Sequence, residues 1–180
     1  MSRDALVVVD MQVGLLDGLP KHDLAGVIQR INALAAMVRR QGGLVVWIRH
    51  CGKAGDGFER GSKGWAFLPT LERQADDVVV EKTLNDSFAG TALHETLQRQ
   101  APHRVLIVGW ATDSCVDSTV RSAISRDYDV VVASDAHTLS DRPHLDAPTV
   151  IRHHNWVWSD LLTNRSTRVA TTSELLAEQR

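Results

Sequence analysis

Residues Ala5–Val9 read ALVVV, and the polar residue that ends this run is Asp10. A strand with one face in water alternates apolar and polar residues, whereas an unbroken apolar run indicates a strand covered on both faces. Such strands are typical of a parallel sheet between helical layers. Five further short runs, mostly rich in Val, Ile and Leu, have the same character: Leu44–Arg49, Val78–Glu81, Val105–Gly109, Val130–Ala133 and Arg168–Ala170.

Helical patterns separate these runs. The first helix has its apolar residues on one stripe, with Asp23 as its predicted N-cap and Gly42 just past its end. The stripe consists of Leu24, Val27, Ile28, Ile31, Leu34, Ala35 and Val38. Later helices are predicted over Thr91–Gln100, Cys115–Arg126 and Asp146–Leu162, and a last one follows the capping-box spacing of Thr171–Glu174. This alternation predicts an α/β sandwich with right-handed crossovers.

Length and composition bound the class of protein. A chain of 180 residues is predicted to form one domain, residues 1–180. The 20 Lys and Arg residues against 22 Asp and Glu give a net charge of −2, which argues against a nucleic-acid partner bound through a broad basic surface. No apolar run approaches the ~20 residues of a membrane span, so we expect no membrane partner.

The cysteine count and the amino-terminal sequence bear on the compartment. The chain has only two cysteines, Cys51 and Cys115, so no disulfide framework beyond one bridge can form. The first residues lack the long apolar segment of a signal peptide. We therefore expect a cytoplasmic protein with free thiols.

Chemically active residues follow the predicted strands. In an open parallel sheet, ligands bind beyond the carboxyl ends of the strands, so these residues should share one edge. They are Asp10 after the first strand, His50 and Cys51 after the second, Lys82 after the third, Trp110–Cys115 after the fourth, and Asp135 and His137 after the fifth.

Cys115 lies where a strand-to-helix turn should deliver the first residues of a helix. The free N–H groups and positive dipole end there favour a thiolate over a thiol, and Lys82 nearby would act in the same direction. The spacing alone also allows a buried, inert cysteine, which is how most free cysteines behave.

Three separated segments resemble the isochorismatase-like cysteine hydrolase family, which includes nicotinamidases, N-carbamoylsarcosine amidases, ureidoacrylate amidases and isochorismatases. They are VVVDMQVGLLDG around Asp10, VVEKTLNDSFAGT around Lys82 and VGWATDSCVDSTVRSA around Cys115. The resemblance implies a three-layer α/β/α sandwich with a central, mainly parallel, Rossmann-like six-stranded sheet. It also implies a catalytic triad of Asp10, Lys82 and Cys115.

The resemblance further implies a mechanism. Asp10 would take the proton of Cys115, and the thiolate would attack the carbonyl carbon of a small amide, ureido or carbamoyl compound. The backbone N–H groups of Ala111 and Cys115 would form the oxyanion hole, with a cis peptide between Trp110 and Ala111. Hydrolysis of the thioester would follow the release of ammonia or an amine, with no cofactor.

Two departures narrow this chemistry. The metal site of nicotinamidases begins with an Asp-x-His pair after the second strand, but Ile48 stands two residues before His50 here. We therefore expect no metal, and we expect His50 to touch substrate. Isochorismatases act on a vinyl ether and need no cysteine nucleophile, so Cys115 favours amide or carbamoyl hydrolysis.

Other functions stay open at this point. A vinyl ether hydrolase of the isochorismatase type is one alternative. A non-catalytic or redox-sensing protein, in which Cys51 and Cys115 change reversibly, is another. A nucleotide-binding Rossmann protein is disfavoured, because no G-x-G-x-x-G motif follows any predicted strand.

Several residues near the triad are candidates for the substrate pocket. Trp65, Phe88 and Trp110 are candidate walls, although a core position is equally compatible with each. Gln12 and Asp113 are polar residues that could orient the substrate. Pocket shape would also depend on the predicted long loop Cys51–Gly64. The predicted helix Asp146–Leu162 places Trp156 opposite its apolar face. Because members of the family that the chain resembles commonly form dimers or larger assemblies, the resemblance implies a homodimer or larger homo-oligomer with this helix at the contact; an exposed tryptophan without a partner is the alternative.

Overall fold

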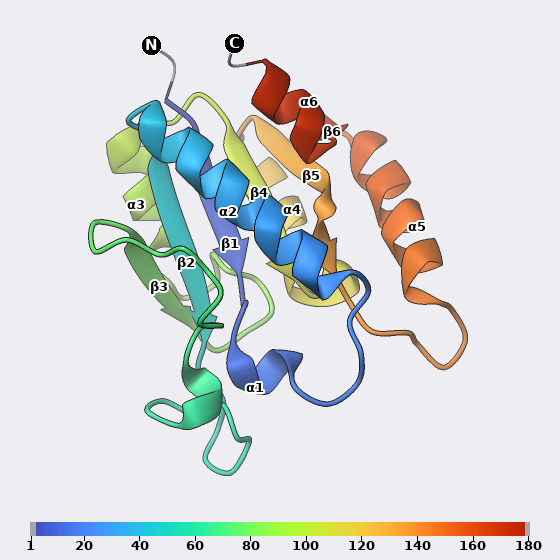
Figure 1. Ribbon diagram of the computed structural model, residues 1–180. Helices are drawn as coiled ribbons and strands as arrows, with labels where there is room; N and C mark the ends of the chain where they lie inside the picture. The colour runs from blue at the N-terminus through green and yellow to red at the C-terminus, as the bar shows by residue number, and fades with distance from the viewer. Residues whose placement is uncertain (1–2, 179–180) are drawn as a thin grey trace.

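The structure is a computed structural model that describes residues 3–178. Its centre is a six-stranded sheet in the order β3-β2-β1-β4-β5-β6, in which every neighbouring pair of strands is parallel (Figure 1). The strands are β1 (Ala5–Val9), β2 (Leu44–His50), β3 (Val78–Lys82), β4 (Val105–Trp110), β5 (Val130–Thr138) and β6 (Thr167–Ala170). The predicted parallel α/β fold is therefore confirmed.

Helices cover both faces of the sheet. They are α1 (Val13–Leu16), α2 (Leu24–Arg40), α3 (Leu93–Gln100), α4 (Asp117–Ile124), α5 (Ala147–Ser159) and α6 (Thr172–Ala177), with a 3₁₀ turn η1 (Lys63–Trp65) and a π-helical turn η2 (Thr112–Val116). In Figure 1, α2 and α6 lie in front of the sheet, and α3 and α4 lie behind it.

The side chains of β1 show why both faces must be covered. Leu6 and Val8 pack against α2 and α6, whereas Ala5, Val7 and Val9 pack against α3, α4 and α5. All five side chains are fully buried. A strand enclosed in this way needs an unbroken apolar sequence, which is what ALVVV supplies.

The fifth strand extends five residues beyond its predicted end, to Thr138. Its pairing with β4 shifts register between Ile107 and Gly109, and the extension carries Asp135 and His137 inside the strand. Asp135 accepts hydrogen bonds from the backbone N–H and hydroxyl of Thr172, the first residue of α6. The sequence pattern did not predict this extension because it contains polar residues. Their polar groups bind neighbouring residues rather than solvent, so they are compatible with a strand inside the fold.

Two predicted helix starts differ from the structure. Asp23 precedes α2, but its backbone is left-handed, with φ at 45°, and its carboxylate pairs with Arg30 rather than capping the helix. The predicted helix over Cys115–Arg126 begins earlier, as the π turn that contains Cys115, and becomes α-helical only at Asp117. The capping box of Thr171 and Glu174 forms as predicted.

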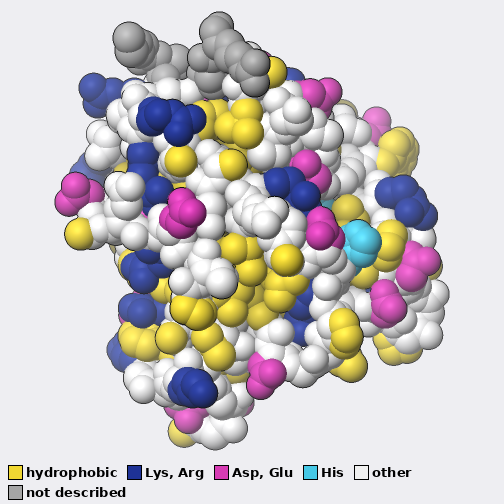
Figure 2. Space-filling model, viewed as in Figure 1, with side chains coloured by type: hydrophobic (Ala, Val, Ile, Leu, Met, Phe, Trp, Pro, Cys, Tyr) yellow, Lys and Arg dark blue, Asp and Glu magenta, His cyan; other side chains and the backbone are white. Residues whose placement is uncertain are grey.

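The surface carries charges of both signs. On the face shown in Figure 2, basic and acidic side chains are interspersed, and hydrophobic side chains gather below α2. Within residues 3–178, no helix combines the length and apolar character needed to cross a membrane.

Candidate active site

Asp10 occupies the first position after β1. Its backbone is left-handed, with φ at 53°, a conformation that aspartate tolerates better than most residues. Its N–H donates to the carbonyl of Ile48, which ties the residue to the end of β2. Because the turn leaves the strand in the middle of the sheet, the Asp10 side chain is fully buried.

Lys82 ends β3 and reaches Asp10 across β2. Its Nζ lies 2.7 Å from Asp10 Oδ2, and neither side chain is exposed. The same Nζ donates to the carbonyl of Leu84 at 2.9 Å and to that of Asn85 at 3.1 Å. The ammonium therefore makes two hydrogen bonds to main-chain carbonyls and an ion pair with Asp10.

Cys115 lies in η2 and is only 6% exposed. The thiol is close enough to Asp10 and Lys82 for both to shift its pKa, and its Sγ is 3.8 Å from Asn85 Oδ1. The structure thus brings together all three residues of the predicted triad, one from the end of β1, one from β3 and one from the turn after β4.

Burial raises the pKa of the Cys115 thiol to about 11, and the charge of Asp10 acts in the same direction while Lys82 opposes it. The prediction that the helix start would favour a resting thiolate was therefore wrong. A helix terminus favours an anion only modestly, whereas removal from water and a nearby carboxylate both disfavour it.

Asp10 is subject to the same opposing influences. Burial raises the pKa of its carboxyl, while the charge and hydrogen bonds of Lys82 and the hydrogen bond of Cys115 lower it. A thiol that stays protonated beside a carboxylate with a raised pKa can pass its proton over a short distance. The arrangement therefore suits a thiol that ionises as it attacks.

The turn that follows β4 brings Ala111 close to Cys115. The peptide bond between Trp110 and Ala111 is cis, and the Ala111 carbonyl accepts from the N–H groups of Ser114 and Val116. Just before this turn, Gly109 allows β4 to approach β1 closely: its φ is 121°, and a Cβ there would lie 2.2 Å from the carbonyl oxygen of Val9.

Gln12 is fully buried, and main-chain groups occupy its amide. Its Nε2 donates to the carbonyls of His50 at 2.9 Å and Trp65 at 3.2 Å, while its Oε1 accepts from the His50 N–H at 2.6 Å. The expectation that Gln12 orients substrate is therefore corrected. Through these bonds Gln12 holds the end of β2 and the segment 51–66 against the turn that follows β1.

His50 and Trp65 lie at the rim of this site. Burial and the charge of Lys82 lower the pKa of the half-buried His50 imidazole, whose ring packs against Phe58 with centroids 5.7 Å apart. The Trp65 Nε1 donates to Cys51 Sγ at 3.3 Å, and the Arg49 guanidinium lies 3.5 Å from the Trp65 ring centroid. Both cysteines are free thiols.

Two other candidate pocket residues have structural partners instead. Phe88 is 4% exposed and stacks on Tyr128 within the core, so its ring is not a free pocket wall. The Asp113 carboxylate receives two hydrogen bonds from Arg142, at 2.8 and 2.6 Å, so Arg142 fixes its orientation. Trp110 is half-buried, packs against Leu139, and is the candidate that adjoins the Ala111 turn.

Sequence reasoning missed Asn85, although it lies inside one of the quoted motifs. Its exposed side chain faces Cys115, and its carbonyl receives the Lys82 ammonium. Only its position three residues after Lys82 could have pointed to it. Within residues 3–178, no group of three His, Cys, Asp or Glu side chains could hold a metal ion.

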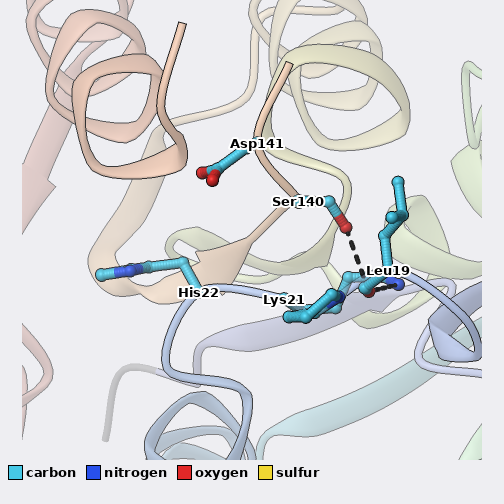
Figure 3. Close-up of a pocket in the computed structure, with 6 residues that line it drawn as sticks. Leu19, Lys21, His22, Ser140 and Asp141 are labelled. Carbon is cyan, nitrogen blue, oxygen red and sulfur yellow. Dashed lines mark hydrogen bonds between the residues drawn. The ribbon is translucent and has the colours of Figure 1, made fainter. Parts of the chain in front are cut away.

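A pocket of about 330 Å³ lies at the same end of the sheet, between the connection that follows α1 and the one that follows β5. Figure 3 shows its lining residues, with Lys21 and the Ser140 hydroxyl both donating to the Leu19 carbonyl. His22 and Asp141 complete the labelled set. The pocket lining does not include Asp10, Lys82 or Cys115.

The fold and the arrangement of the site are those of an isochorismatase-like α/β protein. The family model for the isochorismatase domain matches residues 4–157. The chain therefore belongs to the isochorismatase family, which confirms the family that its three motifs resemble.

Similar proteins in the family have several activities. A streptothricin hydrolase of Streptomyces noursei is 32% identical over 140 residues, which cover 77% of this chain and 51% of that protein. The chain thus spans about half the length of the streptothricin hydrolases that it matches. The ureidoacrylate amidohydrolase RutB of Variovorax paradoxus is 28% identical, covering 75% of this chain and 68% of that protein.

Among solved structures, a cysteine hydrolase from Pseudomonas syringae pv. phaseolicola superposes with a TM-score of 0.88 at 25% identity. The superposition covers 98% of this chain and 92% of that one. Similarity over nearly the whole of both chains means that the sheet and its helical layers are shared.

Proposed function

We propose that this protein is a cysteine-dependent hydrolase of a small amide, ureido or carbamoyl compound. The observation that carries the proposal is the buried cluster in which Lys82 Nζ lies 2.7 Å from Asp10 and the buried Cys115 thiol, 3.8 Å from Asn85, is near enough to Asp10 for that charge to raise its pKa. Two of the relatives, named as a hydrolase and an amidohydrolase, support the reaction class.

In the first half of the reaction, Asp10 takes the proton of Cys115 as the sulfur attacks the carbonyl carbon. A carbon–sulfur bond forms, and the carbonyl oxygen becomes an oxyanion. Asp10 then gives its proton to the leaving nitrogen, and the carbon–nitrogen bond breaks to release ammonia or an amine. Proton transfer of this kind typically contributes about 10²–10⁴-fold to the rate.

In the second half, Asp10 takes a proton from water, and the hydroxide attacks the thioester. The acid product leaves, and the proton returns to the Cys115 sulfur. Throughout, the Lys82 ammonium compensates the charge of Asp10, and neither side chain is exposed at rest. Two donors of Lys82 bind the carbonyls of Leu84 and Asn85 and its ammonium pairs with Asp10, so we assign it an electrostatic role.

The N–H groups of Ala111 and Cys115 would receive the oxyanion. The bonds from Ser114 and Val116 to the Ala111 carbonyl close the turn and hold these two residues near each other. Loss of one such donor typically costs about 3–4 kcal/mol of transition-state stabilisation.

The test is an ammonia-release screen over primary amides, ureas and carbamoyl amino acids, run with wild type, Cys115→Ala and Cys51→Ala. We expect turnover in wild type and in Cys51→Ala, and none in Cys115→Ala. Mass spectrometry of acid-quenched enzyme should show an acyl group on Cys115. Retention of more than about a tenth of kcat in Cys115→Ala would remove the thioester mechanism. Hydrolysis of an added vinyl ether to an alcohol and a carbonyl compound, with no ammonia released from any amide, would favour the isochorismatase reaction.

We also propose a cytoplasmic location and a homo-oligomeric state. The free thiols of Cys51 and Cys115 suit a reducing compartment. Trp156 is 63% exposed on α5, on the side opposite the fully buried Trp158. A large exposed aromatic side chain on a helix is a frequent feature of contacts between subunits.

A further inference from the structure

A buried hydrogen bond anchors the turn between Ala111 and Cys115. Thr112 directly follows Ala111, its side chain is fully buried, and its Oγ1 lies 2.9 Å from Nδ1 of His137. His137 belongs to the extension of β5 and is also buried. The contact therefore joins the turn to a neighbouring strand rather than to solvent.

Asn155 of α5 determines which His137 nitrogen carries the proton. The Asn155 Nδ2 donates to the carbonyl of Ser134 at 3.0 Å, so its Oδ1 faces His137 Nε2, also at 3.0 Å. A carboxamide oxygen only accepts hydrogen bonds, and Nε2 must therefore carry the proton. In a neutral imidazole Nδ1 is then the acceptor, and the Thr112 hydroxyl donates to it.

The surroundings keep this imidazole neutral. Burial lowers the pKa of His137 to about 4, with a smaller effect of His154 in the same direction and opposing effects of Asn155 and Asp135. The ring packs edge-on against Trp158, with centroids 5.1 Å apart. The Trp158 Nε1 donates to Asp117 in the first turn of α4, so a single set of contacts holds α5, β5 and the start of α4 together.

We propose that His137 is a positioning residue, which holds the Thr112 hydroxyl and thereby fixes the Ala111–Cys115 turn that receives the oxyanion. The inference rests on the proposed function. Without the acceptor at Nδ1, Thr112 would have to rotate toward another partner, and the N–H groups of Ala111 and Cys115 would lose their fixed separation. Because the oxyanion forms only during reaction, the loss should fall on kcat rather than on substrate binding.

The main test is Thr112→Val, which removes the hydroxyl and keeps the shape, compared with Thr112→Ser, which keeps the hydroxyl. We expect Thr112→Val to lower kcat by about 10–100-fold with KM within threefold. This is less than the roughly 10²–10³-fold loss caused by removing an oxyanion donor, because the N–H groups are displaced rather than removed. Thr112→Ser should recover kcat to within about threefold of wild type. The rate of Cys115 alkylation by iodoacetamide should change by less than about twofold in both variants, because no oxyanion forms in that reaction.

Thr172→Val is the matched control. Thr172 is also buried, and its hydroxyl donates to Asp135 of the same strand at 2.8 Å, but it lies at the start of α6 on the opposite face of the sheet. Its loss should lower the melting temperature and leave kcat within about twofold. If Thr112→Val behaves like this control, the inference is overturned and the proposed function stands.

A second measurement does not depend on turnover. In ¹⁵N-histidine-labelled protein, long-range ¹H–¹⁵N spectra should show His137 with a proton on Nε2 and none on Nδ1 from about pH 5 to 8, with assignment from His137→Asn. Asn155→Leu should release this tautomer preference. A proton on Nδ1 in wild type would overturn the inference. A wild type that turns over no compound and resists alkylation at Cys115 would instead overturn the proposed function and, with it, the catalytic role of this contact.

Discussion

The ammonium of Lys82 lies 2.7 Å from the carboxylate of Asp10, and neither side chain has any exposed surface. A buried ion pair gains its attraction only by giving up the hydration of both charges, so each partner depends on the other. Here the pair lies beside a protonated thiol, and the pKa values of Asp10 and Cys115 are both raised by burial. The ion pair is therefore the feature that makes a carboxylate available as a base inside the core.

Lys82→Met should reveal what the ion pair contributes to stability and what it contributes to catalysis. Removal of one partner from a buried pair typically costs about 3–5 kcal/mol, although protonation of Asp10 would relieve part of that cost. We expect a lower free energy of unfolding in urea and a kcat at least 100-fold below wild type, because the protonated carboxyl cannot act as a base. Lys53→Met, at an exposed lysine, should change neither quantity. Full activity of Lys82→Met would show that the ammonium has no electrostatic role.

Activity should depend on pH through Asp10. The base must be ionised, and burial raises its pKa above the ordinary value of 3.8. The acid limb of kcat/KM should therefore lie above that value, with activity lost as pH falls through the raised pKa. In the free enzyme, the rate of Cys115 alkylation should keep rising towards about pH 11, where the thiol ionises. A flat alkylation rate above neutral pH would mean that the thiolate already exists at rest.

Gln12→Met should destabilise the protein. The substitution preserves the shape of the side chain but leaves the N–H and carbonyl of His50 without their partners. Unsatisfied buried polar groups cost roughly 1–3 kcal/mol each, so we expect a loss of about 2–4 kcal/mol in urea unfolding. Gln98→Met, on the exposed side of α3, is the control. An unchanged midpoint would show that Gln12 does not fasten the two segments.

His137 should make stability fall with acidification. Burial holds its folded-state pKa at about 4, against 6.5 for an unperturbed imidazole. Above pH 6.5 both states are neutral, and below it the unfolded state binds the proton first. The free energy of unfolding should therefore fall by about 3 kcal/mol between pH 7 and 4 from this group.

His137→Asn tests that contribution, because asparagine does not titrate. The variant should lose less stability on acidification than wild type, by roughly the amount given above, even if it is less stable at pH 7. His144→Asn, at an exposed histidine, should keep the wild-type slope. Equal dependence of the free energy of unfolding on pH in all three proteins would mean that the folded-state pKa of His137 is not lowered.

Trp156→Ser should shift the protein towards monomer. We expect sedimentation velocity to show a homodimer or larger assembly for wild type, because Trp156 is 63% exposed on α5. Leu19→Ser is the control, since Leu19 is similarly exposed but lies in the connection between α1 and α2. Dissociation by Leu19→Ser alone would place the contact at the connection between α1 and α2, and a monomeric wild type would remove the proposal.

The sequence by itself determined the parallel sheet and the edge at which the candidate site lies. Runs such as ALVVV can be buried only between two helical layers, and the carboxyl ends of parallel strands share one edge. The order of the motifs around Asp10, Lys82 and Cys115 then places these residues at that edge. The family could be predicted for the same reason, since each motif follows a strand that can be recognised from its own residues.

Only the tertiary structure decided the protonation and the partners of the residues at that edge. The pKa of Cys115 is raised because burial and the charge of Asp10 outweigh the effect of Lys82, and the extent of burial depends on every layer of the fold. Asp113 accepts hydrogen bonds from Arg142, which lies 29 residues further along the chain. Gln12 is taken by the His50 backbone, at a separation of 38 residues. Residue type and spacing show that a side chain can bind, but which partner it binds depends on distances between segments that only folding sets.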